Sequence, residues 1–208
     1  RRGLLCSNGL GMLVAQAKRS SEQFTGTVIG DEALERVERT VNHRLRNIIL
    51  IGMPGAGKST VGVLLAKALG KTFLDTDLLL QEQEGMLLQD LVDRLGVESF
   101  LDREADALCA LDCRHTVIAP GGSAVCRERS MARLKELGRV VYLHVPLPEL
   151  ERRIHNITTR GIVLKHGCSL QDAFVERVPL YEQYSDYTVD GTGKSIEECV
   201  EEIVRLFR

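Results

Sequence analysis

A glycine-rich loop at residues 52–60, Gly-Met-Pro-Gly-Ala-Gly-Lys-Ser-Thr, constrains the fold of this 208-residue chain more than any other segment. A short apolar run, residues 46–51, precedes the loop, and residues 60–69 follow with apolar side chains at helical spacing before Gly70. A buried strand, a loop that matches G-x-x-x-x-G-K-[ST] and a helix, in this order, predict a binding site for a nucleoside triphosphate. The glycines let backbone N–H groups face an anion, and the N-terminus of the helix adds partial positive charge.

The residue types in this loop predict how ATP and Mg²⁺ would be held. We expect Lys58 to reach the β- and γ-phosphates and the Ser59 hydroxyl to coordinate Mg²⁺. The predicted ATP site in the loop consists of Gly55, Ala56, Gly57, Lys58, Ser59 and Thr60. The loop identifies only the phosphate donor, because proteins with many different functions share this motif and fold.

Composition and charge narrow the classes of ligand. The chain carries 27 Lys and Arg against 29 Asp and Glu, so no basic excess predicts binding to nucleic acid. No apolar run approaches the ~18 residues that would suggest a membrane span. Six cysteines without a C-x-x-C pair or a zinc-ligand spacing predict reduced thiols in a cytoplasmic protein. None of these features predicts an oligomeric state.

Short apolar runs alternate with helical patterns through the rest of the chain. Besides residues 46–51, strands are expected at residues 72–74, 116–119, 140–145 and 187–189. This alternation predicts an α/β, P-loop NTPase fold with a five-stranded parallel sheet and helices on both faces. Residues 156–169 lack a clear period, and we expect them to form a mobile loop.

Two aspartates, Asp75 and Asp77, follow the second predicted strand. The carboxyl ends of parallel strands form the edge of the sheet where ligands bind. One carboxylate is therefore a candidate for the shell of the metal, and the other for holding an acceptor hydroxyl and removing its proton. The two residues also fit an ordinary helix start in which an aspartate caps residues 78–80, so both interpretations stay open.

At this point the chain resembles the shikimate kinase family, from about Asn47 to Arg208. The resemblance is carried by residues 52–62, Phe-Leu-Asp-Thr-Asp at 73–77, Pro-Gly-Gly-Ser-Ala-Val at 120–125 and Glu-Arg-Val-Pro-Leu-Tyr at 176–181. It implies ATP-dependent phosphorylation of shikimate at its 3-hydroxyl. It also implies a fold like that of the nucleoside monophosphate kinases, with a lid loop.

The resemblance implies roles on the acceptor side of the reaction. Asp77 would hold the shikimate hydroxyls and act as the base, and Gly122 would bring a backbone N–H to the substrate. Arg177 would pair with the shikimate carboxylate, which a planar guanidinium can bind through two hydrogen bonds. From the residues alone, Arg177 also fits a charge on the surface of a helix.

On the donor side, the resemblance implies that Asp75 lies near Mg²⁺ beside Ser59. Arg160 would be the lid arginine that closes over the phosphates, and Lys194 would contact the adenine. The implied catalytic residues are thus Lys58, Asp77 and Arg160. Arg160 also fits a solvated loop charge, and Lys194 fits a lysine that only precedes a helix.

Three positions depart from the family pattern. Leu101 stands where the family has an arginine that clamps the shikimate carboxylate, and Arg103 cannot simply replace it because helical residues two apart point ~200° from each other. Ser123 replaces the third glycine of Gly-Gly-Gly. Residues 160–163 read Arg-Gly-Ile-Val instead of Arg-Pro-Leu-Leu. The donor chemistry therefore looks intact, while the acceptor site is altered.

These departures leave three hypotheses of function. The first is a shikimate kinase that uses ATP and Mg²⁺. The second is a related P-loop kinase for another small hydroxyl compound, which Leu101 motivates. The third is a nucleotide-binding regulatory module without turnover. The joint presence of Asp75, Asp77, Arg160 and Arg177 argues against the third.

Residues 8–26 resemble the C-terminal tail of shikimate dehydrogenase, including Gln16, which in that family touches shikimate. This resemblance predicts that residues 1–45 are a C-terminal remnant of such a domain plus a linker, and residues 46–208 the kinase-like domain. The chain would then belong to a dehydrogenase–kinase fusion. An unrelated amphipathic helix at Met12–Ser20 is the alternative.

Overall fold

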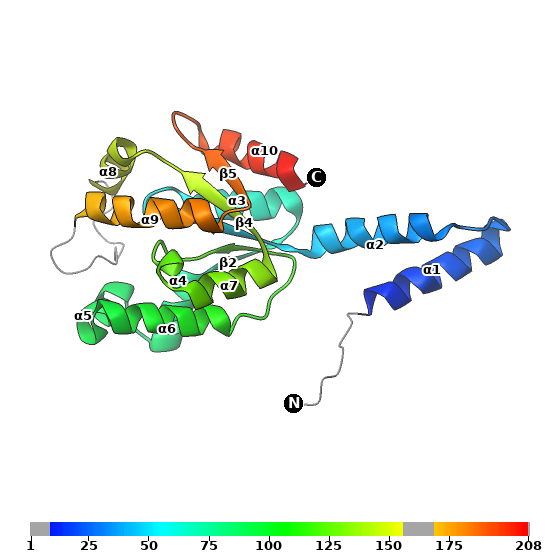
Figure 1. The fold of residues 1–208 in the computed structure, drawn as a ribbon, viewed down its shortest axis with the longest axis horizontal. Coiled ribbons are helices and arrows are strands. Elements are labelled where there is room, and N and C mark those ends of the chain that lie inside the picture. The colour runs from blue at the N-terminus through cyan, green and yellow to red at the C-terminus, as the bar shows by residue number, and fades with distance from the viewer. Residues whose placement is uncertain (1–8, 156–168, 208) are drawn as a thin grey trace. The chain divides into compact units, whose positions relative to one another are not determined.

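The computed structural model describes residues 9–155 and 169–207 of the chain. The chain divides into two compact units, residues 1–45 and residues 46–208 (Figure 1). The predicted lid arginine, Arg160, and the altered residues 161–163 lie outside the described residues. No helix in the described part is long and apolar enough to cross a membrane.

The larger unit is built on five parallel strands in the order β2-β3-β1-β4-β5. These are β1 (Asn47–Ile51), β2 (Thr72–Asp75), β3 (Thr116–Ala119), β4 (Gly138–His144) and β5 (Tyr187–Asp190). Every residue of β1 and β3 is buried, which explains why both strands, after their first residues Asn47 and Thr116, are continuous apolar runs rather than alternating ones. The predicted five-stranded parallel sheet is confirmed.

Strand β4 begins two residues earlier than predicted. Gly138 pairs with Asn47 of β1, and a Cβ atom at position 138 would collide with the Asn47 carbonyl oxygen. Glycine therefore allows a close backbone approach here. A pattern of apolar side chains cannot reveal that approach, because glycine has no side chain to contribute to the pattern.

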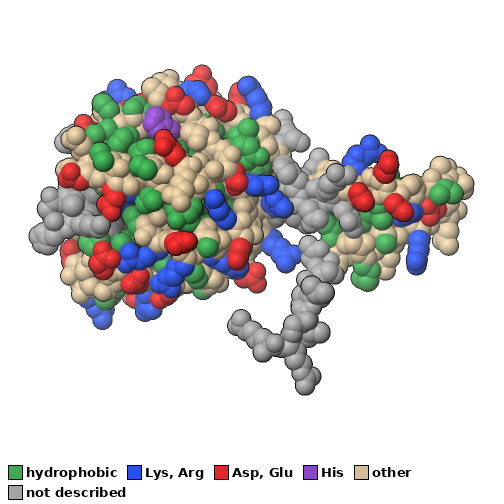
Figure 2. Space-filling model, viewed as in Figure 1, with side chains coloured by type: hydrophobic (Ala, Val, Ile, Leu, Met, Phe, Trp, Pro, Cys, Tyr) green, Lys and Arg blue, Asp and Glu red, His purple; other side chains and the backbone are tan. Residues whose placement is uncertain are grey.

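Helices cover the sheet and connect its strands. They are α3 (Lys58–Leu69), α4 (Thr76–Glu84), α5 (Leu88–Leu95), α6 (Val97–Cys109), α7 (Glu128–Leu137), α8 (Leu147–His155), α9 (Leu170–Tyr184) and α10 (Ile196–Phe207), with a short 3-10 helix, η1 (Ala124–Cys126). Helix α3 packs beside α10, and α6 packs along α7 (Figure 1). On the face shown in Figure 2, charged side chains of both signs are interspersed over this unit.

Two apolar clusters stabilise the larger unit. The main core surrounds the sheet. A smaller cluster lies between α4, α5 and α6, and its buried members are Leu80, Leu88, Leu91, Phe100 and Leu101. Two of its members, Leu88 and Phe100, also line the pocket described below.

The smaller unit consists of α1 (Leu10–Thr25) and α2 (Asp31–Leu45), which pack against each other. Helix α1 contains the segment Met12–Ser20 and ends at Gly26, whose φ of 68° is left-handed. Of the described side chains in α1, only Val14 is buried, whereas Phe24 is 92% exposed. These two helices bury little apolar surface between them.

Candidate active site

The phosphate loop follows the buried strand β1 and ends in α3. Gly52 has a φ of 149°, and a Cβ atom there would lie 2.7 Å from the Leu143 carbonyl oxygen, so a larger residue does not fit. At the other end of the loop, Gly57 is the N-cap of α3. The loop backbone therefore leads directly to a helix N-terminus, which favours a bound anion.

The Lys58 ammonium lies inside the curl of this loop. Its Nζ donates hydrogen bonds to the carbonyl oxygens of Gly52, at 2.9 Å, and Met53, at 3.2 Å. Burial lowers the pKa of Lys58 to about 8, although the nearby carboxylates of Asp77 and Asp75 oppose that change. Negative phosphates beside the amine would favour its charged form, so the site is suited to a highly charged anion.

Asp75 joins the loop to the edge of the sheet through both of its carboxylate oxygens. One oxygen accepts hydrogen bonds from the backbone N–H groups of Asp77, at 3.0 Å, and Leu78, at 3.4 Å, and so caps α4. The other accepts a hydrogen bond from the Ser59 hydroxyl at 2.7 Å. The capping interpretation of Asp75 is therefore correct, and it is compatible with a role near the metal.

The adjacent oxygens of Ser59 and Asp75 suit Mg²⁺, which prefers hard oxygen ligands. No cluster of three or more His, Cys, Asp or Glu side chains that could hold a metal occurs in the described part of the chain. This pair alone is enough for an Mg²⁺ ion that takes its remaining ligands from phosphates and water, as is usual for nucleotide sites.

Two carboxyl groups border Gly121 at the acceptor side. A Cβ atom on Gly121 would lie 2.7 Å from Oδ1 of Asp77 and would collide with Oε1 of Glu104. Glu104 is only 4% exposed, and its Oε1 accepts a hydrogen bond from the Ser123 hydroxyl at 3.0 Å. The absence of a side chain at Gly121 thus leaves room for two carboxyl groups on the same side of this residue, of which Asp77 lines the pocket and Glu104 is buried.

Burial raises the pKa of the Glu104 carboxyl to about 7, and the negative charge of Asp77 acts in the same direction. The hydrogen bond from Ser123 and the charges of Arg177 and Lys58 oppose this rise. A buried carboxyl whose pKa is raised beside a second carboxylate is typical of functional sites.

Arg177 reaches the same pocket from α9. It is only 5% exposed, so the alternative that it is a surface charge is wrong. One turn later on the same helix, the Tyr181 hydroxyl donates a hydrogen bond to the Gly122 carbonyl oxygen at 2.6 Å. Helix α9 therefore positions both the arginine and the turn that carries Gly122.

One pocket brings these segments together. Its lining includes Gly55, Gly57, Lys58, Ser59, Asp75, Asp77, Gly121, Gly122, Ser123 and Arg177, with Leu88 and Phe100 as apolar walls. Phosphate-binding, carboxylate and guanidinium groups therefore face a common space at the carboxyl edge of the sheet. This arrangement can hold a triphosphate on one side and a small anionic hydroxyl compound on the other.

Comparison with known proteins shows which family has a sequence like that of this chain. The family model described as shikimate kinase matches residues 54–208. A shikimate kinase of Bacillus cytotoxicus is 36% identical over 162 residues, covering 77% of this chain and 98% of the relative.

The chain belongs to the shikimate kinase family.

Other relatives agree with this assignment. A shikimate kinase of Nitrosomonas europaea is 34% identical over 165 residues, which cover 78% of each protein. Among solved structures, shikimate kinase from Acinetobacter baumannii in complex with shikimate matches with a TM-score of 0.71 and 29% identity, covering 80% of this chain and 96% of that one. The Aquifex aeolicus shikimate kinase matches with a TM-score of 0.64 and 30% identity, covering 76% and 94%.

The predicted family and fold are thus confirmed for the larger unit. The family match begins at residue 54 and does not include the N-terminal segment. The resemblance of residues 8–26 to shikimate dehydrogenase therefore stays a prediction.

Leu101, where the chain departs from the shikimate kinase pattern, belongs to the smaller apolar cluster. Leu101 is 3% exposed and packs with the leucines of α4 and α5. Arg103 instead pairs with Glu84, with 2.7 Å between Nε and Oε1, and it does not line the pocket. As the helical spacing predicted, Arg103 does not take the place of the missing arginine.

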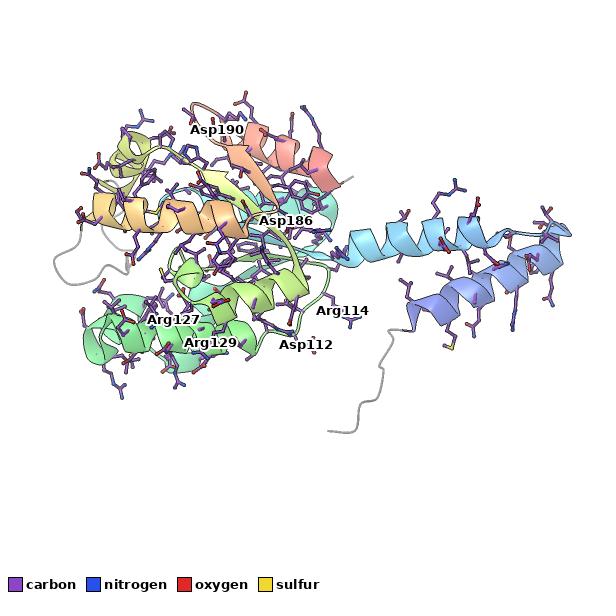
Figure 3. The ribbon with its side chains drawn as sticks, in the orientation of Figure 1. Asp112, Arg114, Arg127, Arg129, Asp186 and Asp190 are labelled. Atoms are coloured by element: carbon purple, nitrogen blue, oxygen red, sulfur yellow. The ribbon has the colours of Figure 1, made fainter. Side chains whose placement is uncertain are left out.

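Ion pairs on the outer side of α6 fix this helix to the chain that follows the Gly121–Ser123 turn. The Arg127 guanidinium contacts Glu98 at 2.8 Å and Asp102 at 2.7 Å, and Arg129 lies beside it (Figure 3). Such partly exposed pairs stabilise by only ~0–1 kcal/mol each. They join α6 to the residue between η1 and α7, Arg127.

A second cleft adjoins the back of the phosphate loop and contains Lys194. Its lining includes Gly55, Ala56, Gly57, Leu143, Val145, Arg153, Lys194 and Cys199. The Lys194 ammonium contacts Glu202 at 2.6 Å. Lys194 thus lies in a cleft that adjoins the phosphate loop, and its contact with the adenine stays a prediction. Thr60 is exposed on α3.

The sequence did not lead us to expect Glu104 in the site, nor the hydrogen bond that Ser123 donates to it. A signal for Glu104 was present, because it lies at helical spacing from the buried residues Phe100, Leu101 and Leu108. A carboxylate on the apolar face of a helix is unusual, and it therefore indicates a paired or functional group.

Proposed function

We propose that this chain transfers the γ-phosphoryl group of ATP to the 3-hydroxyl of shikimate. The observation that carries the proposal is the common pocket, in which the phosphate loop, Asp77, Gly122 and Arg177 face one another in a member of the shikimate kinase family. The Bacillus cytotoxicus relative supports it, since nearly the whole of that kinase aligns with residues of this chain.

On the donor side, Lys58 would pair with the β- and γ-phosphates at the N-terminus of α3. Ser59 and Asp75 would hold Mg²⁺, which when bound neutralises charge on the phosphate oxygens. Arg160 is proposed to add a further positive charge from the lid segment, and Lys194 to contact the adenine. These residues stabilise charge that spreads over the phosphoryl group during transfer.

On the acceptor side, Asp77 would hold the 3-hydroxyl and receive its proton. The hydroxyl oxygen then bonds to the γ-phosphorus, while the bond from that phosphorus to the bridging oxygen breaks and ADP leaves. Arg177 would bind the carboxylate through two hydrogen bonds, and the backbone N–H of Gly122 would contact the substrate. The buried position of Arg177 strengthens such a contact because water competes less for the guanidinium.

Leu101 favours a second candidate, a kinase of the same kind for another small hydroxyl compound. A hydrogen bond to a charged group is worth ~1.5–3 kcal/mol, so loss of one arginine contact weakens binding of a carboxylate roughly 10- to 100-fold. An acceptor without that carboxylate would lose nothing. The two candidates therefore differ in how strongly turnover depends on the carboxylate of the acceptor.

We also propose that residues 1–45 are the C-terminal part of a shikimate-dehydrogenase-like domain and a linker, preceding the kinase domain at residues 46–208. The resemblance of residues 8–26 supports this. So do the exposed apolar side chains of Met12, Phe24 and Val28, which a larger domain would cover. Reading the coding sequence upstream of Arg1 tests the proposal, which requires the rest of a dehydrogenase domain there.

Cys109, Cys113 and Cys199 are reduced cysteines in the described part of the chain. Reduced thiols are usual in the cytoplasm, where disulfides are rare. This supports the proposal that the enzyme acts in the cytoplasm. Labelling the purified protein with a thiol reagent, with and without prior reduction, tests whether these thiols are free in solution.

Release of ADP that depends on added shikimate is the decisive assay. We expect wild-type protein with ATP and Mg²⁺ to release ADP only when millimolar shikimate is present. Asp77→Asn should lower this rate by ~10²–10⁴-fold, the usual contribution of a general base. Asp112→Asn is a matched control, because Asp112 is exposed on the loop after α6 and does not line the pocket (Figure 3).

A wild-type protein that binds ATP but is not stimulated by any small hydroxy acid would sink the proposal and leave a regulatory nucleotide-binding module. Stimulation by another acceptor but not by shikimate would favour the second candidate.

A further inference from the structure

Two of the positions that depart from the shikimate kinase pattern, Leu101 and Ser123, are neighbours of one buried residue, Glu104, the first along α6 and the second through a hydrogen bond. Ser123 is 3% exposed, and its hydroxyl donates a hydrogen bond to Oε1 of Glu104 at 3.0 Å. Leu101 precedes Glu104 by three residues on α6, and both side chains are buried. Residues three apart on a helix are neighbours on its surface.

An arginine at position 101 would therefore lie within reach of Glu104. Leucine has no donor and packs into the apolar cluster instead. The Glu104 carboxyl loses a neighbour that could neutralise it, while Ser123 brings a hydroxyl where the family has only a glycine. The two departures thus have opposite effects on the same carboxyl.

We propose that Ser123 is a positioning residue for the acceptor pocket, which holds Glu104 ionised beside Asp77 and compensates for Leu101. Ionised Glu104 lies beside Gly121 on the same side as Asp77, outside the pocket lining, and it acts on the substrate hydroxyl groups through Asp77 and the Gly121–Ser123 turn. This inference rests on the proposed function, because it concerns binding of the same acceptor.

Several charged groups around Glu104 influence whether its carboxyl group is ionised. Asp77, from α4, disfavours a second negative charge, and burial acts in the same direction. Arg177 from α9 and Lys58 from α3 favour the ionised form, as does the hydrogen bond from Ser123. Because the pKa of Glu104 is about 7, removing one favourable contact would raise this pKa and increase the protonated fraction at neutral pH.

A double-mutant cycle tests the proposal. The four proteins are wild type, Ser123→Gly, Leu101→Arg and the double variant, each assayed for kcat and KM with shikimate between pH 6 and pH 9. We expect Ser123→Gly to lower kcat/KM about 10-fold at pH 7, mostly through KM, as loss of a hydrogen bond to a charged group would do. The acid limb of its pH profile should move to higher pH.

In the Leu101→Arg background, the same Ser123→Gly change should cost less than about 2-fold, because the new guanidinium supports Glu104 instead. Ser123→Ala is a second test that does not loosen the backbone, and it should also move the acid limb to higher pH. Ser130→Ala is the matched control. Ser130 is 1% exposed on α7, its hydroxyl has no hydrogen-bond partner among the described residues, and it does not line the pocket.

Two failures can be told apart. If wild-type protein does not phosphorylate shikimate, the proposed function fails. If wild-type protein does so but neither Ser123 variant moves the acid limb or the KM, the role of Ser123 is overturned and the proposed function stands. Additive costs in the cycle would overturn the compensation between Ser123 and Leu101.

Discussion

Replacing Glu104 by glutamine is expected to stabilise the larger unit above neutral pH while impairing turnover. The carboxyl is buried beside Asp77, and its pKa rises from an ordinary value of 4.5 to about 7. Glutamine has nearly the same shape and can still accept the Ser123 hydrogen bond, but it carries no charge. The change therefore removes the buried charge and keeps the packing.

The magnitude and its sign follow from proton binding. Between pH 4.5 and about 7 the folded wild type holds a proton on Glu104 that the unfolded chain has released. The free energy of unfolding of the wild type therefore falls as pH rises through this window, and it stays lower above it. At about 1.36 kcal/mol per pKa unit, the variant should gain roughly 3 kcal/mol over wild type above pH 7 and almost nothing at pH 4.5.

Urea unfolding of the full chain at several pH values measures this difference. All four tyrosines lie within residues 46–208, so tyrosine fluorescence reports on the larger unit. The difference in the free energy of unfolding between variant and wild type is taken at each pH. Groups that titrate alike in both proteins then contribute nothing to this difference. A gain in stability that is the same at pH 5 and pH 8 would refute the assignment of a strained buried charge to Glu104.

Three further variants probe the pocket. Gly121→Ala should lower kcat by ~10²-fold, because the new methyl group would lie 2.7 Å from Oδ1 of Asp77 and misplace the base; an unchanged kcat would contradict it. Arg177→Lys should raise the KM for shikimate about 10-fold, since lysine cannot bind a carboxylate in two-point fashion; it should leave the KM for ATP unchanged. Lys194→Ala should raise the KM for ATP a few-fold, because the lost contact is worth roughly 1 kcal/mol. Lys67→Ala is its control, since Lys67 is exposed on α3.

The donor half of the site could be predicted from the sequence because it is local. Strand β1, the phosphate loop and α3 are consecutive, so the spacing of Gly52, Lys58 and Ser59 already determines which groups face the phosphates. The strand order β2-β3-β1-β4-β5 and the hydrogen bond between Ser59 and Asp75 join segments that are apart in the chain, and these features required the structure.

The acceptor half could be predicted only in part, because it depends on contacts between segments far apart in the chain. Glu104 meets Ser123 across the α6–η1 contact, and no pattern in either segment alone shows that the two side chains touch. The resemblance to the family indicated Arg177, but only the structure shows that it is buried. Leu101 was recognised as a departure, whereas its place in a closed apolar cluster required the fold.

Steady-state release of ADP across a panel of small hydroxy acids tests the central claim most directly. The account predicts that shikimate has the highest kcat/KM, and that its analogue without the carboxylate is a markedly poorer substrate because Arg177 loses its partner. An equally good or better kcat/KM for the analogue without a carboxylate would contradict shikimate as the acceptor.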